Sequence, residues 1–297
     1  MSRSRRAWEW AVERVVQAAG ILAILFVILI FAFLLRDALP VFRGRSLGDL
    51  LAGGRWLPTS EPPQFGLLPL LLGSLYVTVG ALVIAVPLGL ACAVFISEVA
   101  PVRVREVLKS AVELLATIPS VVFGFLGLLL IGPWLAERLN LPIGQFAALG
   151  SLILAFMAMP TIVSVSEDAI RAVPRALRDN SLALGATRWQ TIVRVVVPAA
   201  RSGVVAAVLL GLGRAIGETI TVLMVTGNAA VIPAGLQGFV RPVRTMTATI
   251  AAEMGETAYR TPHYHALFAV GLMLFLITFA TNTIADVAVR RTAGAGR

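Results

Sequence analysis

Long uncharged apolar runs constrain this sequence more than any other feature. Residues 15–35 contain no charged side chain, and an apolar stretch beyond about 18 residues is typical of a helix that spans a bilayer. Further apolar runs follow at about 67–96, 114–135, 141–166, 202–226 and 266–285. We therefore predict an all-α integral membrane protein with six transmembrane helices and boundaries uncertain by several residues.

The composition excludes other classes of protein. Hydrophobic residues make up 58% of the chain and charged residues 14%, whereas soluble domains carry about 25% charged residues. The net charge of +9 does not indicate nucleic acid, because the basic residues flank the apolar runs and are not interleaved with aromatic residues. The single cysteine, Cys92, allows neither a disulfide framework nor a cysteine metal site.

The distribution of basic residues predicts the orientation in the cytoplasmic (inner) membrane. With the N-terminus inside, the inner segments hold 16 arginine and lysine residues and the outer segments hold 8, and cytoplasmic loops carry such an excess. We expect both termini in the cytoplasm. Residues 1–14 and 290–297 would be cytoplasmic, and 15–289 would form one transmembrane domain with its core at 67–285.

The inner segment 167–201 contains a glycine-centred pattern. Its spacing resembles the cytoplasmic signature of ATP-binding-cassette (ABC) import permeases, although Asp179-Asn180-Ser181 stands where that family usually has Glu-Ala-Ala. We expect two short helices separated at Gly185, because glycine tolerates backbone angles that other residues resist. Arginines on the flanks would be Arg178, Arg188 and Arg194. Apolar residues expected to face one way are Leu182, Leu184, Trp189, Ile192 and Val196.

We interpret this segment as a docking site for a separate ATPase. The residues predicted to dock are Asp179, Leu182, Ala183, Gly185, Ala186, Trp189, Val195, Val197 and Pro198. The alternative is an amphipathic loop that lies on anionic lipid. The one lysine, Lys109, has no glycine-rich segment before it, so the chain lacks a phosphate-binding P-loop. ATP and magnesium would be bound by the partner, and no cofactor is expected in this chain.

Two charged residues, Arg214 and Glu218, interrupt the fifth apolar run. Four residues apart on one helix, they would share a face, and a charge at a helix centre in the membrane costs about 2.5–3.5 kcal/mol. We predict that Arg214 binds a passing anion by bidentate hydrogen bonds. Glu218 would orient it or accept a proton from the anion, with Thr219 beside them on the pathway. The alternative is a mutually neutralising pair that fixes helix packing, while Gly213 and Gly217 form a small-residue packing face.

The outer segment 241–256 alternates threonine with apolar residues and ends in Glu253 and Glu256. It is either a re-entrant or interfacial helix that meets an external protein, or an ordinary amphipathic connector. The nearby His263 and His265 are interpreted as interfacial residues and not as metal ligands.

The motifs taken together give a specific resemblance. In order, they are W-L-P at 56–58, F-G-L-L-P at 65–69, I-S-E-V-A-P at 96–101, E-L-L-A-T-I-P-S-V-V-F-G at 113–124, G-R-A-I-G-E-T at 213–219, V-R-T-M-T-A-T-I-A-A-E-M-G-E at 243–256 and H-Y-H-A-L-F at 263–268. This order resembles the permease subunits of phosphate ABC importers, of the type with F-G-L-L-P before the second helix.

The resemblance implies a type I ABC importer permease that has no ATPase site of its own. Its partners would be a second, related permease chain, a dimer of cytoplasmic ATP-binding subunits and an extracytoplasmic phosphate-binding protein, and its cargo would be phosphate. The family's intramembrane arginine and glutamate correspond to Arg214 and Glu218. Two alternatives stay open at this point: a permease for another oxyanion such as sulfate or molybdate, and a self-contained, ion-coupled secondary transporter.

Overall fold

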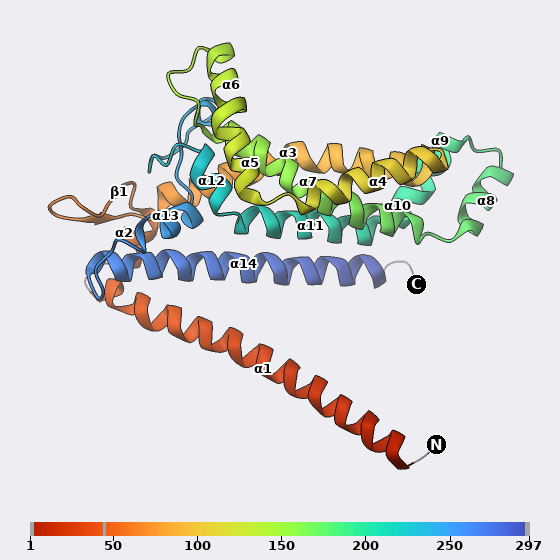
Figure 1. Cartoon of the computed structure of the whole chain (residues 1–297), viewed down its shortest axis with the longest axis horizontal. Helices are drawn as coiled ribbons and strands as arrows, with labels where there is room; N and C mark the ends of the chain where they lie inside the picture. Colours follow the sequence, from red (N-terminus) through yellow and green to blue (C-terminus); the bar gives the residue numbers. More distant parts are fainter. Residues whose placement is uncertain (1–2, 44–45, 295–297) are drawn as a thin grey trace.

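The computed structural model describes residues 3–43 and 46–294, and most of them are helical (Figure 1). Its long helices are α1 (Arg3–Phe42), α3 (Leu68–Val94), α4 (Val102–Thr117), α7 (Ala147–Arg171), α11 (Arg201–Gly217) and α14 (Pro262–Gly294). The shorter α5 (Ser120–Leu126), the π-helix η2 (Gly127–Ile131) and α6 (Gly132–Leu139) follow one another directly. The predicted all-α fold is confirmed. Within the described residues it also contains a short antiparallel hairpin, in which β1 (Trp56–Leu57) and β2 (Gln64–Phe65) have two residues each.

The centre of the bundle is a tight packing of α3, α7 and α11. Ile162 of α7 is fully buried between Gly89 of α3 and Gly211 of α11. A Cβ atom would come within 2.9 Å of Ile162 at Gly89 and within 2.6 Å of it at Gly211. Small residues that let backbones approach in this way are typical of helix packing in membranes. α7 is thus the central helix, and α14 packs against α11 from the other side.

Five helices are long and apolar enough to cross a membrane, and a sixth span results if a bent pair counts as one. The five are Glu9–Phe42, Leu68–Val99, Ser120–Leu139, Ala147–Arg171 and Pro262–Val287; the bent pair is Arg188–Ala199 with Arg201–Gly217, at 69°. The third span begins later than predicted, at Ser120. The preceding residues, from Leu114 to Thr117, belong to α4, which has no buried residue and ends where Ile118 and Pro119 turn extended.

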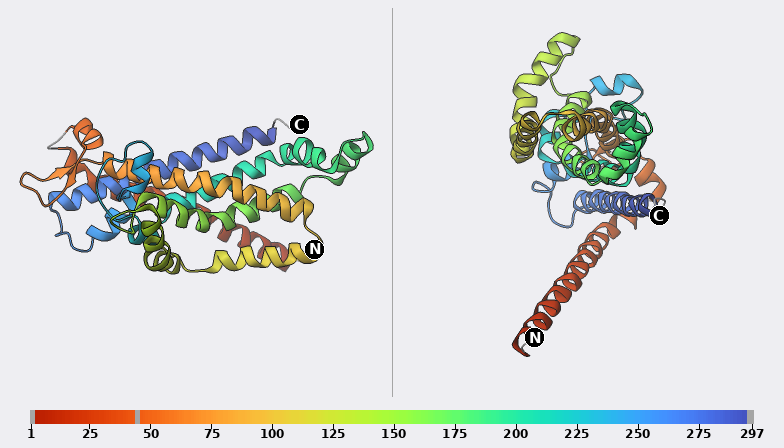
Figure 2. Two further views of the ribbon diagram at one scale, coloured as in Figure 1. Left: turned by 90° about the horizontal axis from the view of Figure 1, so that it is seen from above. Right: turned by 90° about the vertical axis from the view of Figure 1, so that its right-hand side faces the viewer.

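The first helix, α1, diverges from the bundle (Figures 1 and 2). It meets α14 near its own C-terminal end, where Phe31 and Phe275 are in ring contact. None of its most apolar 18-residue window is buried, and side chains such as Val15 and Ile21 are about two-thirds exposed. Apolar side chains on all sides of a helix suit a hydrocarbon environment. α1 therefore presents its surface to lipid or to another chain.

The bundle has two different ends. The first turns of α1 and the last turns of α14 lie at one end, together with α8 (Arg175–Ala183) and α9 (Arg188–Thr191) (Figure 1). We call this the terminal end. The opposite, hairpin end holds α2 (Leu47–Ala52), the β1–β2 hairpin, α6 and α13 (Met246–Glu253). The predicted tail 290–297 is helical up to Gly294, and its last three residues, like residues 1–2, lie outside the described part of the chain.

Candidate docking knob, membrane pathway and outer cavity

The segment predicted to dock an ATPase forms a compact knob at the terminal end. α8 ends at Ala183, and Gly185 then adopts φ +86°, where glycine is favoured. Hydrogen bonds from Gly185 N to Leu182 O (3.0 Å) and from Ala186 N to Ser181 O (3.2 Å) close the turn. Thr187 and Gln190 cap α9 reciprocally. The predicted break at Gly185 between two short helices is confirmed.

The apolar residues of the knob do not all face one way, and that prediction is wrong. Leu182, Leu184 and Trp189 are 44, 89 and 66% exposed. Ile192 and Val196 belong instead to the π-helix η3 (Ile192–Val196) and are buried; Val196 packs in a cluster with residues of α3 and α7. The knob is therefore anchored through η3, which the short α10 (Val197–Ala199) follows, while its tip leaves large apolar side chains exposed.

The residues predicted to dock fall into two groups by exposure. Ala186, Val195 and Val197 are half-buried. The exposed group is Asp179, Leu182, Ala183, Gly185, Trp189 and Pro198. Their docking role stays a prediction, since nothing in this single chain tests it.

Arg178 is not on the exposed flank of the knob. Its Nη2 lies 2.7 Å from Oε1 of Glu98 and donates to Ile170 O at 2.9 Å, and its Nη1 donates to Val173 O. The side chains of Arg178 and Glu98 are 19 and 13% exposed. The sequence predicts Arg178 as one of three flanking arginines, because nothing local connects it to Glu98, 80 residues earlier in the chain.

A second ionic group lies beside this pair. Glu167 of α7 is 2% exposed and accepts from Lys109 Nζ and from Arg171 Nη1, both at 3.0 Å. The hydrogen bond to Glu167 raises the pKa of Lys109, against the opposing effect of desolvation, so Lys109 keeps its charge at physiological pH. The lone lysine of the chain thus fastens α4 to α7.

Arg214 and Glu218 do not share a helix face, which corrects the prediction. α11 ends at Gly217, Glu218 is extended (ψ 127°), and α12 (Ile220–Val225) begins after Thr219. Tertiary contacts hold the break: Thr247 Oγ1 donates to Glu218 O at 3.0 Å, and Thr221 N donates to Glu218 Oε1 at 3.3 Å. No ion pair joins Arg214 to Glu218 among the described residues. The alternative of a neutralising pair on one helix loses its geometric basis.

Arg214 lies on an open face of α11. Gly213 and Gly217 have no atom within 4 Å of where their Cβ atoms would stand, and Leu210 is 55% exposed. These residues recur at the helical spacing of one face, next to the face of the buried Ala207, Gly211 and Ala215. No helix in the described part of this chain packs on Gly213 or Gly217, so the packing role of this small-residue face stays a prediction. Thr219, near the same break, donates to Gly217 O at 3.2 Å.

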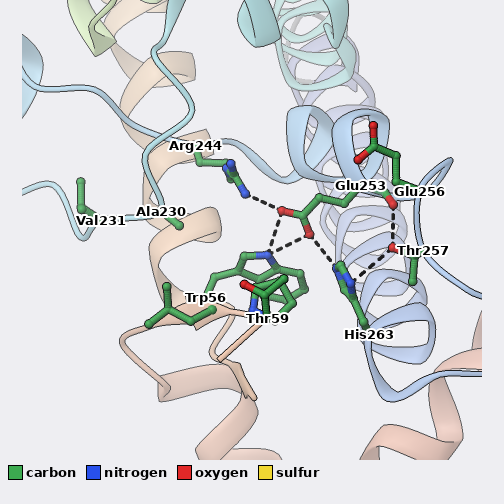
Figure 3. Close-up of a pocket in the computed structure, with 11 residues that line it drawn as sticks. Trp56, Thr59, Ala230, Val231, Arg244, Glu253, Glu256, Thr257 and His263 are labelled. Atoms are coloured by element: carbon green, nitrogen blue, oxygen red, sulfur yellow. Dashed lines mark hydrogen bonds and ion pairs between the residues drawn. The ribbon is translucent and has the colours of Figure 1, made fainter. Parts of the chain in front are cut away.

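A cavity at the hairpin end has a carboxylate at its centre (Figure 3). Glu253 accepts from Trp56 Nε1 at 3.1 and 3.2 Å, lies 2.8 Å from His263 Nε2, and pairs with Arg244. The cavity has a volume of about 600 Å³, and Glu256 also lines it. One side chain thereby joins the hairpin, α13, α14 and the loop before α13. Sequence reasoning noted these residues separately and missed their association.

The outer helix α13 is embedded in the fold. Thr247, Ala248 and Thr249 are buried, and Thr245 caps the helix by accepting from Ala248 N at 3.2 Å. The helix thus resembles the predicted re-entrant element more than a surface connector. His265 lies 2.7 Å from Asp37 O, and no group of metal-ligating side chains occurs among the described residues.

These features define a class: a multi-pass, helical membrane protein with an exposed helical knob at one end of its bundle. Residues 85–294 match the model of the family described as the binding-protein-dependent transport system inner membrane component. The chain belongs to this family.

Relatives agree with the family and with the resemblance to phosphate ABC importer permeases. The probable ABC transporter permease protein YqgH of Bacillus subtilis is 40% identical over 89% of this chain and 85% of its own length. The phosphate transport system permease protein PstC of Haemophilus influenzae is 33% identical over 94% of this chain and 93% of its own, and that of Mesorhizobium japonicum is 36% identical over 82 and 78%.

Solved structures agree in fold. A permease chain of a bacterial alginate ABC transporter, in complex with a pentasaccharide-bound periplasmic protein, aligns over 96% of this chain and 98% of its own with a TM-score of 0.63 and 18% identity. A chain of the inward-facing MetNI methionine ABC transporter aligns over 75% of this chain and 96% of its own, with a TM-score of 0.58 and 19% identity. The predicted type I ABC importer permease architecture is confirmed.

Proposed function

We propose that this chain is a permease subunit that imports inorganic phosphate across the inner membrane, driven by ATP hydrolysis in a partner. The observation that carries the proposal is the combination of an arginine on an open helix face with relatives that are named phosphate transport permeases over most of their length. The chain performs no covalent chemistry. ATP and magnesium belong to the partner, and this chain holds no cofactor.

We assign three surfaces of this chain to partners. The exposed tip of the knob, with Leu182, Leu184 and Trp189, receives a cytoplasmic ATPase dimer. The open face of α11 and the unpacked α1 meet a second, related permease, so that the two chains enclose the path. The hairpin end receives a phosphate-binding protein from outside. In this arrangement both termini are cytoplasmic, since they share an end with the knob.

The chemistry of transport centres on Arg214. Its guanidinium is fixed in charge and offers two parallel donors that match an oxyanion. A charge without an internal partner at this depth is expensive in lipid and marks a polar path. Glu218, held at the helix break by Thr247 and Thr221, places a second polar group near the path. It orients the anion or accepts a proton from it.

Competition between oxyanions tests the cargo. We expect the complex, reconstituted with its ATPase, second permease and binding protein, to take up radiolabelled phosphate when ATP is present inside the vesicles. Excess unlabelled phosphate should block this uptake, and excess sulfate or molybdate should not. Inhibition by sulfate or molybdate equal to that by phosphate would assign the permease to another oxyanion, which the general name of the Bacillus relative leaves open.

A further inference from the structure

The first helix of the knob is attached to the membrane bundle in an unusual way. α8 has no buried residue, although it carries Asp179, Leu182 and Ala183, which are predicted to dock. The second half of the knob is different, because Ile192 and Val196 of η3 are buried. Movement of α8 can therefore reach the bundle through the chain that precedes it, where Val173 is buried, through η3, or through polar contacts.

Arg178 makes the polar contacts. Its guanidinium bridges three elements: α8, which carries it; the π-helix η1 (Phe95–Val99) at the end of α3, through Glu98; and the end of α7, through the carbonyls of Ile170 and Val173. Arginine suits this position, because its planar fork offers five donors in fixed directions and binds the free carbonyls of a helix C-terminus. The hydrogen bond of Ser181, which also lies on α8, stays within the knob, because its partner is Thr191 (3.0 Å).

Glu98 belongs to η1, which hydrogen bonds from Arg105 hold in place. Arg105 donates to the carbonyls of Ile96 (2.9 Å) and Ser97 (3.2 Å) in η1, and Ile96 is buried against the bundle. A displacement of Arg178 thus moves the ends of α3 and α7 together. These two helices pack on each other along their length, and α7 also packs on α11, which carries Arg214.

We infer that Arg178, acting through Glu98, is a positioning residue that transmits movement of the docked ATPase from α8 to α3 and α7. The inference rests on the proposed function. It differs from a merely structural role, because loss of the link should leave the knob folded by η3 and by the cap of α9 while the bundle no longer follows α8. Contiguity alone does not demonstrate such coupling, so the test must measure coupling directly.

The experiment compares four single variants in the reconstituted complex: Arg178→Gln, Arg178→Lys, Glu98→Gln and, as a matched control, Arg175→Gln. Arg175 is an exposed arginine on the same helix. The readouts are phosphate molecules imported per ATP hydrolysed and the fraction of ATPase subunit that co-purifies. We expect Arg178→Gln to lower the transport ratio about 10-fold, within the usual range of coupling between sites, with the ATPase retained. Arg178→Lys should recover part of the ratio, and Arg175→Gln should match the wild type.

The double variant Arg178→Gln/Glu98→Gln sharpens the result. If the two residues act as one link, the double variant should be no worse than Arg178→Gln alone. An unchanged ratio in Arg178→Gln, additive losses in the double variant, or a loss of ATPase subunit in proportion to the loss of uptake would each overturn the inference.

Failure of the proposed function is distinguishable from failure of this inference. If the proposed function is wrong, the wild-type complex will show no ATP-dependent phosphate uptake. In that case, the stimulation of ATP hydrolysis by the loaded binding protein replaces the transport ratio as the readout. Equal stimulation in wild type and Arg178→Gln would then overturn the inference, and a selective loss in Arg178→Gln would support it.

Discussion

Charged side chains at the two ends of the bundle are arranged differently from the one in its middle. At the terminal end Arg178 pairs with Glu98, and Lys109 and Arg171 pair with Glu167; at the hairpin end Arg244 and His263 contact Glu253. On α11, Arg214 instead lies on an open face, and it forms no ion pair within the described part of the chain.

The difference separates charged side chains that hold elements together from Arg214, for which we propose a role in binding the anion. A paired, partly buried charge holds elements together, and removing one partner leaves the other uncompensated. A charge without an internal partner contributes little to folding and is free to bind something else. We therefore expect loss of Glu253 at the hairpin end to reduce stability and a change at Arg214 to reduce transport.

The largest effect is expected for Arg214→Gln. Two charge-assisted hydrogen bonds of about 1.5–3 kcal/mol each would be lost to the anion, so ATP-dependent uptake should fall by at least about 100-fold. The complex should still assemble, with a melting temperature within about 2 °C of the wild type. Arg214→Lys, which keeps the charge but not the planar fork, should retain part of the activity. Wild-type uptake in Arg214→Gln would remove Arg214 from the pathway.

Glu253→Ala tests the side of the comparison in which a charge holds elements together. The side chain of Glu253 is 16% exposed and binds three donors, on Trp56, Arg244 and His263. Because the substitution leaves these donors without their carboxylate partner, it should destabilise the chain by about 2–3 kcal/mol. Thermal unfolding in detergent should show this as a lower melting temperature. The matched control is Glu256→Gln, an exposed carboxylate of the same cavity, which should leave the melting temperature unchanged. Equal stability of the wild type and Glu253→Ala would contradict the fastening role.

Trp189→Ala tests the exposed tip of the knob. A large, exposed aromatic residue at an interface contributes about 2 kcal/mol when it is a hot spot, so affinity for the ATPase subunit should fall about 30-fold. Trp134→Ala is the control, because Trp134 of α6 is similarly exposed (56%) at the opposite end. Titration of labelled ATPase subunit into the purified permease pair measures both. A loss of affinity in the Trp134 variant equal to that in the Trp189 variant would show that the knob is not the specific contact.

The smallest effect is expected for Gly185→Ala. A side chain at φ +86° costs about 1 kcal/mol, which should weaken ATPase binding about fivefold by distorting the turn before α9. Gly255→Ala is the control, since Gly255 has a negative or extended φ and equally open surroundings. The same titration applies, and unchanged affinity in Gly185→Ala would show that the ATPase does not depend on this turn.

Local chemistry explains what the sequence could predict. The apolar runs, the break at Gly185 and the short helices around it depend on neighbouring residues, and the structure confirms them. The break at Glu218 could not be predicted, because the apolar run continues across it and the hydrogen bond from Thr247 that holds it comes from 29 residues away. The same is true of Arg178, whose partner Glu98 is 80 residues earlier.

The candidate site follows the same rule. The residue types of the knob and of the pathway were evident from spacing and from charge in an apolar run. The orientation of Ile192 and Val196 was not, because the π-helix η3 shifts the helical register, and a regular period places them with Trp189. The cluster at Glu253 joins Arg244 and His263, which lie 9 and 10 residues away along the chain, to Trp56, which lies 197 residues away, so no local pattern marks it.

ATP dependence of phosphate uptake is the most direct test of a permease powered through its knob. Vesicles containing the full complex would be prepared with equal ion gradients, with and without internal ATP. We predict uptake only with ATP, and its loss in a complex whose ATPase cannot hydrolyse ATP. A second set of vesicles would contain this chain alone, with the same ion gradient and no ATP. Uptake that persists in these vesicles would contradict the importer and identify a gradient-driven secondary transporter.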